Sequence, residues 1–485
     1  MGHRVFRAYD PAAPVAGPAD LRQWLPADHA LYLLSELVAQ LDLTPILAVD
    51  DQGDGGGNPP YHPVLLTKLL RYAYCAGVVS SRQIAAKTYD DVAFRVLTTD
   101  QHPDFRTISD FRERHLGALT GLFQQVVRLA ARLGLAKLEH VAQDGTKVLA
   151  NASKHRAMSD ARMQQVEERL SREVQALLGA AQVADAVEDA AYGPDRTGDE
   201  LRADLRGEVA RRERRLVTIR AATAALEEEA RAEADAIRAA DAADRQRRAD
   251  AGAPKKPGRP PEPPGVPAPT AQRNFTDPDS RIMKNADKAF VQAYNGQIAV
   301  DAGGYQIIVG CALTNQAADA PHLAAMVEQV RATTGRVPAE WRSDAGYFSA
   351  SNIGVLTAAS STALIPPDRH ATPRAMLPVA VAQVLSTAGC AGPLAAAGET
   401  ETAVKAEMRA RLQTEAGRRA YGLRKHTVEP VFGQVKERRG LRRFLLRGVA
   451  KVAGEWTLWC LTHNLRKLAQ ALRCQPDLRL HLGSR

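Results

Sequence analysis

The chain has 485 residues, which is too long for one ordinary hydrophobic core, and it carries a formal net charge of +9. Its five cysteines are scattered without zinc-ligand spacing and its apolar runs are short and broken by charges. These features argue against a disulfide framework, a structural zinc and a membrane span. The first residues lack the apolar stretch of a signal peptide, so we expect a cytoplasmic protein.

The positive charge is concentrated in the last part of the chain. Residues 401–485 contain 19 Lys and Arg against 7 Asp and Glu, a net charge of +12. A basic segment of this kind favours binding to the phosphates of nucleic acid, because each neutralised phosphate releases counterions. A basic surface without such a partner has the same composition, so charge alone leaves both interpretations open.

Residues from about 20 to 140 show the apolar spacing of helices, with a Gly/Asp/Pro-rich loop at 51–60. The clearest apolar positions are Leu34, Leu37, Val38, Leu41, Leu65, Leu66, Leu69 and Tyr72. We predict two further short helices at 80–87 and 107–115, the second with Thr107, Ser109 and Asp110 as capping candidates. This region is either a DNA-binding helix-turn-helix domain or a helical bundle that supports the domain after it.

A strand pattern begins at His140 and is interrupted by a long charged segment with coiled-coil spacing, which predicts a helical hairpin over residues 155–252. Its apolar positions are Met163, Val166, Leu170, Val174, Leu177, Leu201, Leu205, Val209, Leu216 and Ile219. A Pro-rich stretch, 253–273, follows and is expected to be a semi-rigid spacer. Its Lys-Lys-Pro-Gly-Arg-Pro core also suits an AT-rich minor groove, which is the less favoured alternative.

The second half of the chain alternates strands and helices. We expect two hairpin strands, at 291–301 and 305–314, and then a helix at 322–331. A strand that ends at Asp344 and another strand at 363–365 follow. Together with the strand at His140, this order predicts an α/β fold with a mixed sheet. The Ala-rich stretch 366–420 shows no regular pattern, and we expect it to be loosely ordered.

Two acidic residues stand at strand positions where a carboxylate can serve chemistry. Asp144 lies within the strand-like run after His140, although the dipeptide Asp144-Gly145 also favours a turn. Asp344 is expected at the carboxyl end of a strand, where reactive groups of α/β sheets gather, or else is only a loop cap. Beside it, Gly346 permits close backbone approach, and Tyr347 is a candidate to flank a substrate.

A third acidic residue, Glu429, is set in a helical pattern. The positions Val428, Val431, Phe432 and Val435 form a buried stripe. Since Pro430 disfavours ordinary helical dihedrals in the preceding residue, we expect Glu429 in the first turn of this helix. Lys436 lies seven residues later on a neighbouring face, and Tyr421 and Arg424 stand just before. The alternative is a solvated face with a weak Glu–Lys pairing.

These three settings resemble the acidic motifs of bacterial DDE insertion-sequence transposases. The motifs are Asp144-Gly-Thr-Lys, Asp344-Ala-Gly-Tyr and Tyr421-x2-Arg424-x4-Glu429-Pro-x-Phe-Gly-x2-Lys436. Residues 61–109 are similar to the helical region that precedes the catalytic core in this group, and residues 447–467 are similar to its last helices. The third motif is the most specific, because it fixes six or seven residue types within sixteen positions.

The resemblance implies an RNase H-like catalytic core in which Asp144, Asp344 and Glu429 bind two Mg²⁺ or Mn²⁺ ions. It also implies that Tyr421, Arg424 and Lys436 contact DNA phosphates. The expected activity is cleavage at the ends of a mobile element and joining of the freed 3′-OH to target DNA, with the terminal inverted repeats as partner and a homodimer as the acting unit. Two alternatives remain open: a non-catalytic DNA-binding descendant, and a metal-dependent nuclease without strand transfer.

The sequence thus predicts a division into five parts. Residues 1–135 form a helical N-terminal domain for DNA binding or support, and residues 136–154 with 274–470 form the catalytic domain. Residues 155–252 form the hairpin insertion, 253–273 the linker and 471–485 a C-terminal tail.

Overall fold

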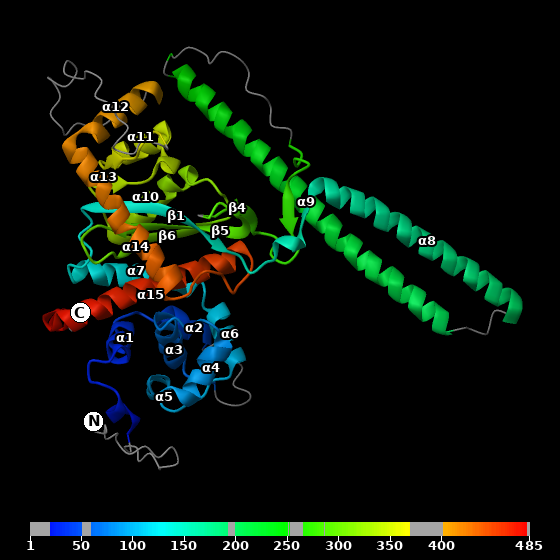
Figure 1. The fold of residues 1–485 in the computed structure, drawn as a ribbon, viewed down its shortest axis with the longest axis horizontal. Coiled ribbons are helices and arrows are strands. Elements are labelled where there is room, and N and C mark those ends of the chain that lie inside the picture. Colours follow the sequence, from blue (N-terminus) through cyan, green and yellow to red (C-terminus); the bar gives the residue numbers. More distant parts are fainter. Residues whose placement is uncertain are drawn as a thin grey trace, which may run out of the picture.

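The computed structural model describes residues 20–50, 60–192, 199–250, 252, 265–285, 287–368 and 401–482. A mixed sheet with helices around it forms the body, the N-terminal helices lie to one side of it, and a pair of long helices projects from it as an arm (Figure 1). The predicted turn at 192–198 falls almost entirely outside the described residues, as do most of the Pro-rich stretch and residues 369–400.

The N-terminal region is helical, as predicted. After a short 3-10 turn, η1 (Leu21–Trp24), its helices are α1 (Ala30–Ala39), α2 (Thr44–Asp50), α3 (Pro63–Cys75), α4 (Ser81–Asp90), α5 (Val92–Thr98), α6 (Phe105–Arg114) and α7 (Ala118–Arg132). Helix α3 begins with Pro63 at its first turn, where a missing N–H costs nothing. The predicted caps of α6 were wrong: Asp104 caps it by accepting the N–H of Arg106, and Thr107, Ser109 and Asp110 lie inside the helix.

The sheet is mixed and is built around two long strands, β1 (His140–Leu149) and β5 (Phe290–Asp301), which pair antiparallel. On the far side of β5 lie β4 (Arg281–Lys284) and β6 (Ile308–Thr314), both antiparallel to it. On the far side of β1, β7 (Glu340–Arg342) and then β8 (Thr362–Leu364) run parallel. This is the mixed α/β arrangement of the predicted RNase H-like core.

Helices cover this sheet and connect its strands. They are α10 (Leu323–Thr334), α11 (Ala350–Ala358), α12 (Glu401–Gln413), α13 (Glu415–Thr427), α14 (Glu429–Gly433) and α15 (Val449–Cys474), with short turns η3 (Ala320–His322), η4 (Ala345–Tyr347), η5 (Gln434–Arg438) and η6 (Pro476–His481). The expectation of loose order was wrong for residues 401–420, which lie in α12 and α13. None of the helices in the described ranges is long and apolar enough to cross a membrane.

One continuous hydrophobic core joins the N-terminal helices to the sheet. Helix α15 lies between them and contacts α1, α3 and α7 on one side and β6 on the other. Its Trp456 and Trp459 are buried with Phe444 in a cluster of aromatic rings. The N-terminal helices are therefore packed onto the body rather than tethered to it, and the division into domains stays a prediction.

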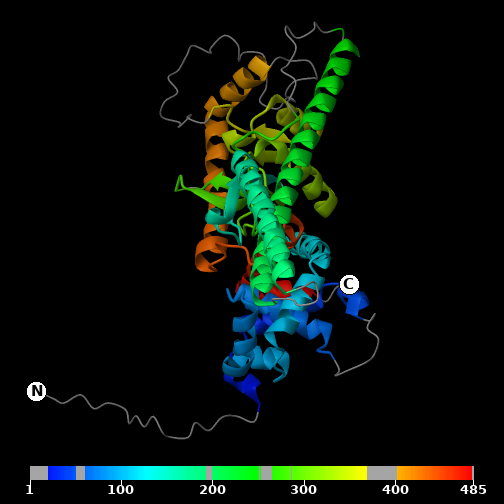
Figure 2. The same ribbon diagram turned by 90° about the vertical axis from the view of Figure 1, so that its right-hand side faces the viewer.

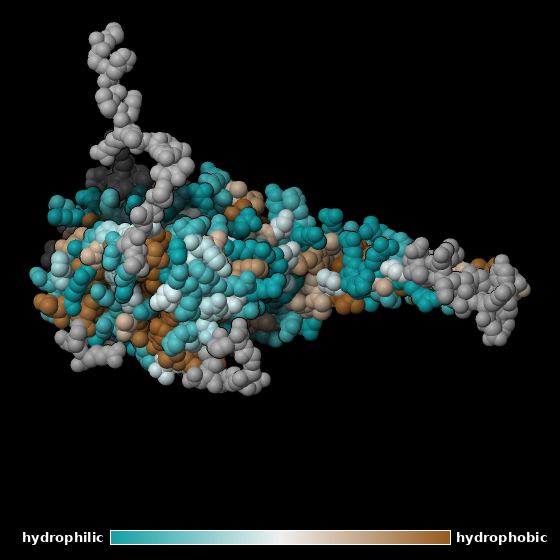
Figure 3. Space-filling model, turned by 90° about the horizontal axis from the view of Figure 1, so that it is seen from below, coloured by the Kyte–Doolittle hydropathy of each residue, from teal (hydrophilic) through white to brown (hydrophobic). Residues whose placement is uncertain are grey.

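The arm consists of α8 (Asp160–Tyr192) and α9 (Asp199–Asp250) and has its own apolar core. The core residues are Met163, Val166, Leu170, Val174, Leu216, Ile219, Ala222 and Leu226. Between the two helices, Arg212 pairs with Glu173 at 3.0 Å and Arg220 pairs with Glu167 at 2.7 Å. The helical-hairpin prediction is confirmed. Figure 2 looks along the arm toward the body, and Figure 3 shows the arm projecting from the body with a largely hydrophilic surface.

The base of the arm is attached by a small sheet and by ion pairs. Strand β2 (Ala157–Ser159), which follows the turn η2 (Lys154–Arg156), pairs antiparallel with β3 (Gln272–Asn274). Glu229 of α9 accepts hydrogen bonds from Arg273 at 2.6 Å and from Arg281 at 2.8 Å. These contacts tie the middle of α9 to the edge of the large sheet at β4.

Candidate active site

The parallel pairing of β1 and β7 brings the first two acidic residues together. His140 lies opposite Glu340 and Ala142 opposite Arg342. The negative charge of Asp344 raises the pKa of Asp144, so the two carboxyl groups lie near each other. Strand β7 ends at Arg342, two residues before the predicted end. Asp344 instead caps the turn η4 by accepting the N–H of Gly346 at 3.0 Å.

Asp144 and Gly145 lie in the middle of β1, so the turn alternative for this dipeptide was wrong. Gly145 is needed for a close approach. An added Cβ at this position would lie 2.3 Å from Nε2 of Gln297 and 2.6 Å from Oδ1 of Asp319. A residue with a side chain directly after Asp144 would therefore displace polar groups that lie beside the acidic pair.

The third acidic residue is brought to Asp144 through Arg424. Helix α13 carries Arg424 and ends at Thr427, and α14 begins at Glu429, which confirms the prediction for the first turn. The Arg424 guanidinium donates to Oδ2 of Asp144 at 3.0 Å and to Oε1 of Glu429 at 3.5 Å. Its side chain is 9 % exposed, whereas that of Glu429 is 52 % exposed. A cation of the chain itself thus bridges two of the three predicted acids.

Electrostatics make the charge of Asp144 costly. Burial is the largest influence and raises the pKa of Asp144 from 3.8 to about 6, with Asp344 and Asp319 adding repulsion and Arg424 acting against them. A further positive charge beside Asp144 would therefore stabilise its ionised form. Strongly perturbed carboxyl groups of this type are typical of functional sites.

The other two predicted DNA-contacting residues lie close to this group. The guanidinium of Arg424 stands 5.8 Å from the centre of the Tyr421 ring, a cation–π contact. Lys436 lies in η5, one turn of π-helix after α14, and its ammonium contacts Oγ1 of Thr146 and donates to the carbonyl of Lys147 at 2.9 Å. Burial lowers the pKa of Lys436. In this structure Lys436 holds its helix against β1.

Tyr347 does not flank a substrate site, contrary to the prediction. Its ring is fully buried, and its hydroxyl donates to Oε1 of Gln297 on β5. Sequence reasoning also missed Asp319, which approaches both Gly145 and Gly346. The signal that was available is the pair Asn295 and Gln297, two polar side chains in the middle of a strand that is buried along most of its length, since buried polar groups require partners.

The donor chemistry of the three acids suits a hard divalent cation, because carboxylate oxygens are its preferred ligands. As arranged among the described residues, no three His, Cys, Asp or Glu side chains lie close enough to hold one ion together. The Arg424 guanidinium contacts both Asp144 and Glu429 and lies between their carboxyl groups.

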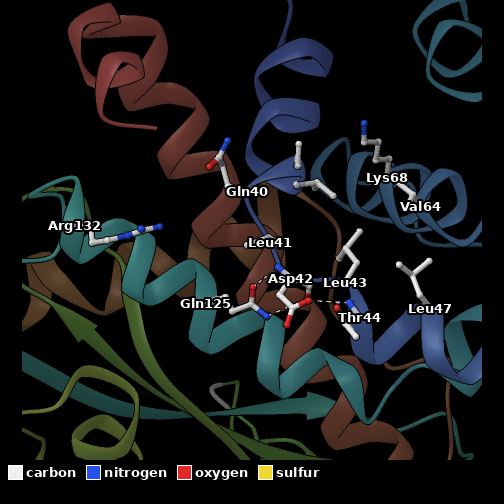
Figure 4. A pocket seen from close by; sticks show the side chains of 12 residues that line it. Gln40, Leu41, Asp42, Leu43, Thr44, Leu47, Val64, Lys68, Gln125 and Arg132 are labelled. Atoms are coloured by element: carbon white, nitrogen blue, oxygen red, sulfur yellow. Dashed lines mark hydrogen bonds between the residues drawn. The ribbon is translucent and has the colours of Figure 1, made fainter. Parts of the chain in front are cut away.

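A separate hollow lies between α1, α2 and α3 on one side and α7 on the other (Figure 4). Its lining is half aliphatic and half polar and includes Lys68 and Arg132. Gln125 exchanges hydrogen bonds with the backbone of Asp42 at 2.7 and 3.2 Å. It contains none of the predicted site residues. Those residues lie instead on β1, at the turn after β7 and on α13, α14 and η5.

Comparison with known families gives two matches. Residues 396–469 match the model described as a transposase DDE domain, and residues 19–114 match the one described as a transposase domain (DUF772). Both matched descriptions are of transposase domains, and together they indicate a DDE-type insertion-sequence transposase. The first match covers Tyr421, Arg424, Glu429 and Lys436, whereas Asp144 and Asp344 fall outside both. Neither the curated proteins nor the solved structures contain a significant match.

The matches carry general implications for the chain. A transposase family implies DNA as a partner, and a DDE domain implies dependence on divalent metal. The helical N-terminal region and the mixed sheet are consistent with this family's fold. Which residues bind metal, which ions they take and which reaction steps follow are questions for the geometry of the site.

Proposed function

We propose that this transposase cuts DNA at the ends of its element and joins the freed 3′-OH to target DNA, with Asp144, Asp344 and Glu429 as the ligands of two Mg²⁺ or Mn²⁺ ions. The proposal is supported by the contacts of Arg424 with both Asp144 and Glu429 and by the electrostatic repulsion between Asp144 and Asp344. The three residues are 200 and 85 positions apart in the chain, and only the fold unites them.

The reaction is chemically balanced without a nucleotide cofactor. In cleavage, the oxygen of a water attacks the phosphorus, the bond to the 3′ oxygen breaks, and that oxygen takes up a proton as 3′-OH. In joining, this hydroxyl attacks a target phosphodiester, so that one ester bond forms as another breaks. Asp144, Asp344 and Glu429 would hold the two cations, which would supply positive charge to activate the attacking oxygen and to stabilise the leaving one.

The other residues of the site orient DNA in this proposal. Arg424 has the planar fork that binds a phosphate through two hydrogen bonds, and it is rigidly mounted on α13 beside the acids. Tyr421 supports the guanidinium by its ring, and Lys436 adds a point charge next to β1. When Arg424 turns from the carboxylates to a phosphate, the gap between Asp144 and Glu429 opens. Cation binding and DNA binding then favour each other.

A cleavage and joining assay on DNA with the element's ends tests the proposal. We expect the wild-type protein with Mg²⁺ to cut and to join, and Glu429→Gln to do neither. Glu437→Gln is the matched control, because Glu437 lies in the next helical turn and pairs with Arg442. Equal cutting by wild type and Glu429→Gln would refute the ligand assignment. DNA binding without cutting would favour the non-catalytic alternative, and cutting without joining the nuclease.

The acting unit is proposed to be a homodimer on paired ends. Sedimentation of the protein with and without end DNA tests this separately, and a single copy on each DNA end would contradict it.

A further inference from the structure

Asp319, which no motif includes, lies at the centre of a polar network next to the acidic pair. Its Oδ1 accepts three hydrogen bonds: from Lys147 at 3.3 Å, from Asn295 at 2.7 Å and from Gln297 at 2.8 Å. Asn295 and Gln297 are fully buried on β5, and they lie opposite Lys147 and Gly145 of β1. Asp319 is therefore fastened to both long strands directly beside Asp144.

The same network reaches the turn that carries Asp344. Gln297 donates to Asp319 and accepts the hydroxyl of Tyr347, so one amide connects the carboxylate to the end of η4. Asn352 of α11 forms a second link, since its amide donates to the carbonyl of Ala320 at 2.8 Å and to that of Tyr347 at 2.7 Å. These hydrogen bonds thus connect η3, the turn after Asp319, to η4, the turn after Asp344.

Two glycines allow this close packing. An added Cβ on Gly346 would lie 3.6 Å from Oδ2 of Asp319 and 3.0 Å from Oδ1 of Asp344. The corresponding atom on Gly145 would lie 2.6 Å from Oδ1 of Asp319. Asp319 therefore lies between Gly145, which directly follows Asp144, and Gly346, which stands two residues after Asp344. A rigid polar bridge at this place fixes the separation of Asp144 and Asp344.

We propose that Asp319 is a positioning residue of the cation site, which holds the Asp344 turn against β1 through Gln297 and Tyr347. The inference rests on the proposed function, because it concerns the site at which Asp144 and Asp344 would bind cations. Groups that orient metal ligands from behind typically change metal affinity by about 10- to 100-fold when they are removed. Asp319 is not proposed as a ligand itself.

The test measures Mn²⁺ affinity by calorimetry and by the electron paramagnetic resonance signal of free Mn²⁺, using the full chain without DNA. Asp319→Ala removes the centre of the network, and Tyr347→Phe removes only its link to η4. Tyr294→Phe is the matched control, because Tyr294 is also buried and donates its hydroxyl to a carboxylate, Asp277, at 2.8 Å, but on the β4 side of the sheet.

We expect Asp319→Ala and Tyr347→Phe each to weaken Mn²⁺ binding by about 10- to 100-fold, and Tyr294→Phe to leave it unchanged. The double variant should bind no more weakly than Asp319→Ala, since both changes break the same connection. Wild-type affinity in Tyr347→Phe would overturn the inference, even if Asp319→Ala failed to fold. A wild-type protein that bound Mn²⁺ no more tightly than Asp144→Asn does, with end DNA as well as without it, would instead overturn the proposed function.

Discussion

The raised pKa of Asp144 predicts that the metal-free protein loses stability as the pH rises. Burial and nearby acids raise this pKa from 3.8 to about 6. Each pKa unit corresponds to about 1.4 kcal/mol, so ionisation of Asp144 destabilises the folded state by about 3 kcal/mol relative to the unfolded chain. Because the folded state has the higher pKa, this stability is fully present below pH 3.8 and is lost as the pH rises through about 6.

The substitution Asp144→Asn removes the titration and keeps the shape. We expect the free energy of unfolding of this variant to rise relative to wild type by about 1.5 kcal/mol between pH 5 and pH 8, roughly half of the total change. Urea denaturation in EDTA at both pH values measures it, with Glu437→Gln as the control for an exposed carboxylate. Comparing variants at each pH cancels the titration of all other groups.

An equal difference between wild type and Asp144→Asn at pH 5 and pH 8 would refute the reasoning, because Asp144 would then titrate alike in both states. Addition of Mn²⁺ at pH 8 provides a second check. A ligand at a hundred times its dissociation constant stabilises the folded state by about 2.7 kcal/mol. We expect this gain for wild type and not for Asp144→Asn.

Three further outcomes are expected. Gly145→Ala should lower the free energy of unfolding by about 1–3 kcal/mol through overpacking. The control Gly422→Ala, whose added methyl group lies in open space on α13, should raise the melting temperature. Equal melting temperatures of Gly145→Ala and wild type would contradict this prediction. Arg424→Gln should destabilise the metal-free protein by about 3 kcal/mol at pH 8 and by less at pH 5. The reason is that Asp144 is ionised at pH 8 and then loses the guanidinium that pairs with it. Urea denaturation at the two pH values measures the difference. Ile219→Ala should speed amide exchange in α8 and α9 and leave α15 protected, since the arm has a separate core.

The sequence predicted best what depends on local pattern. Alternation after His140 gave β1, coiled-coil spacing gave the core of the arm, and Pro430 placed Glu429 at the start of α14. Each of these depends on residues that lie near one another in the chain. The helices at 401–427 were missed because most of their residues are either charged or small and form no clear apolar stripe. In α12 only Val404 and Met408 are buried.

The sequence did not predict contacts between distant segments. Asp319 is one of 55 acidic residues, and its partners Lys147 and Gln297 lie far from it in the chain. Tyr347 was assigned to a substrate because it follows Asp344, yet its hydroxyl reaches a strand fifty residues earlier. That Arg424 bridges Asp144 and Glu429 also required the fold, because the spacing of the motif shows only that Arg424 and Glu429 are near each other.

The central position of α15 bears on how a newly made chain reaches this structure. Helix α15, which begins at Val449, is synthesised late, and four earlier elements pack against it: α1, α3, α7 and β6. At about 5–20 residues per second, the earlier helices wait on the order of half a minute with apolar faces uncovered. Nascent chains of this protein should therefore depend on chaperones, and a fragment ending before Val449 should aggregate.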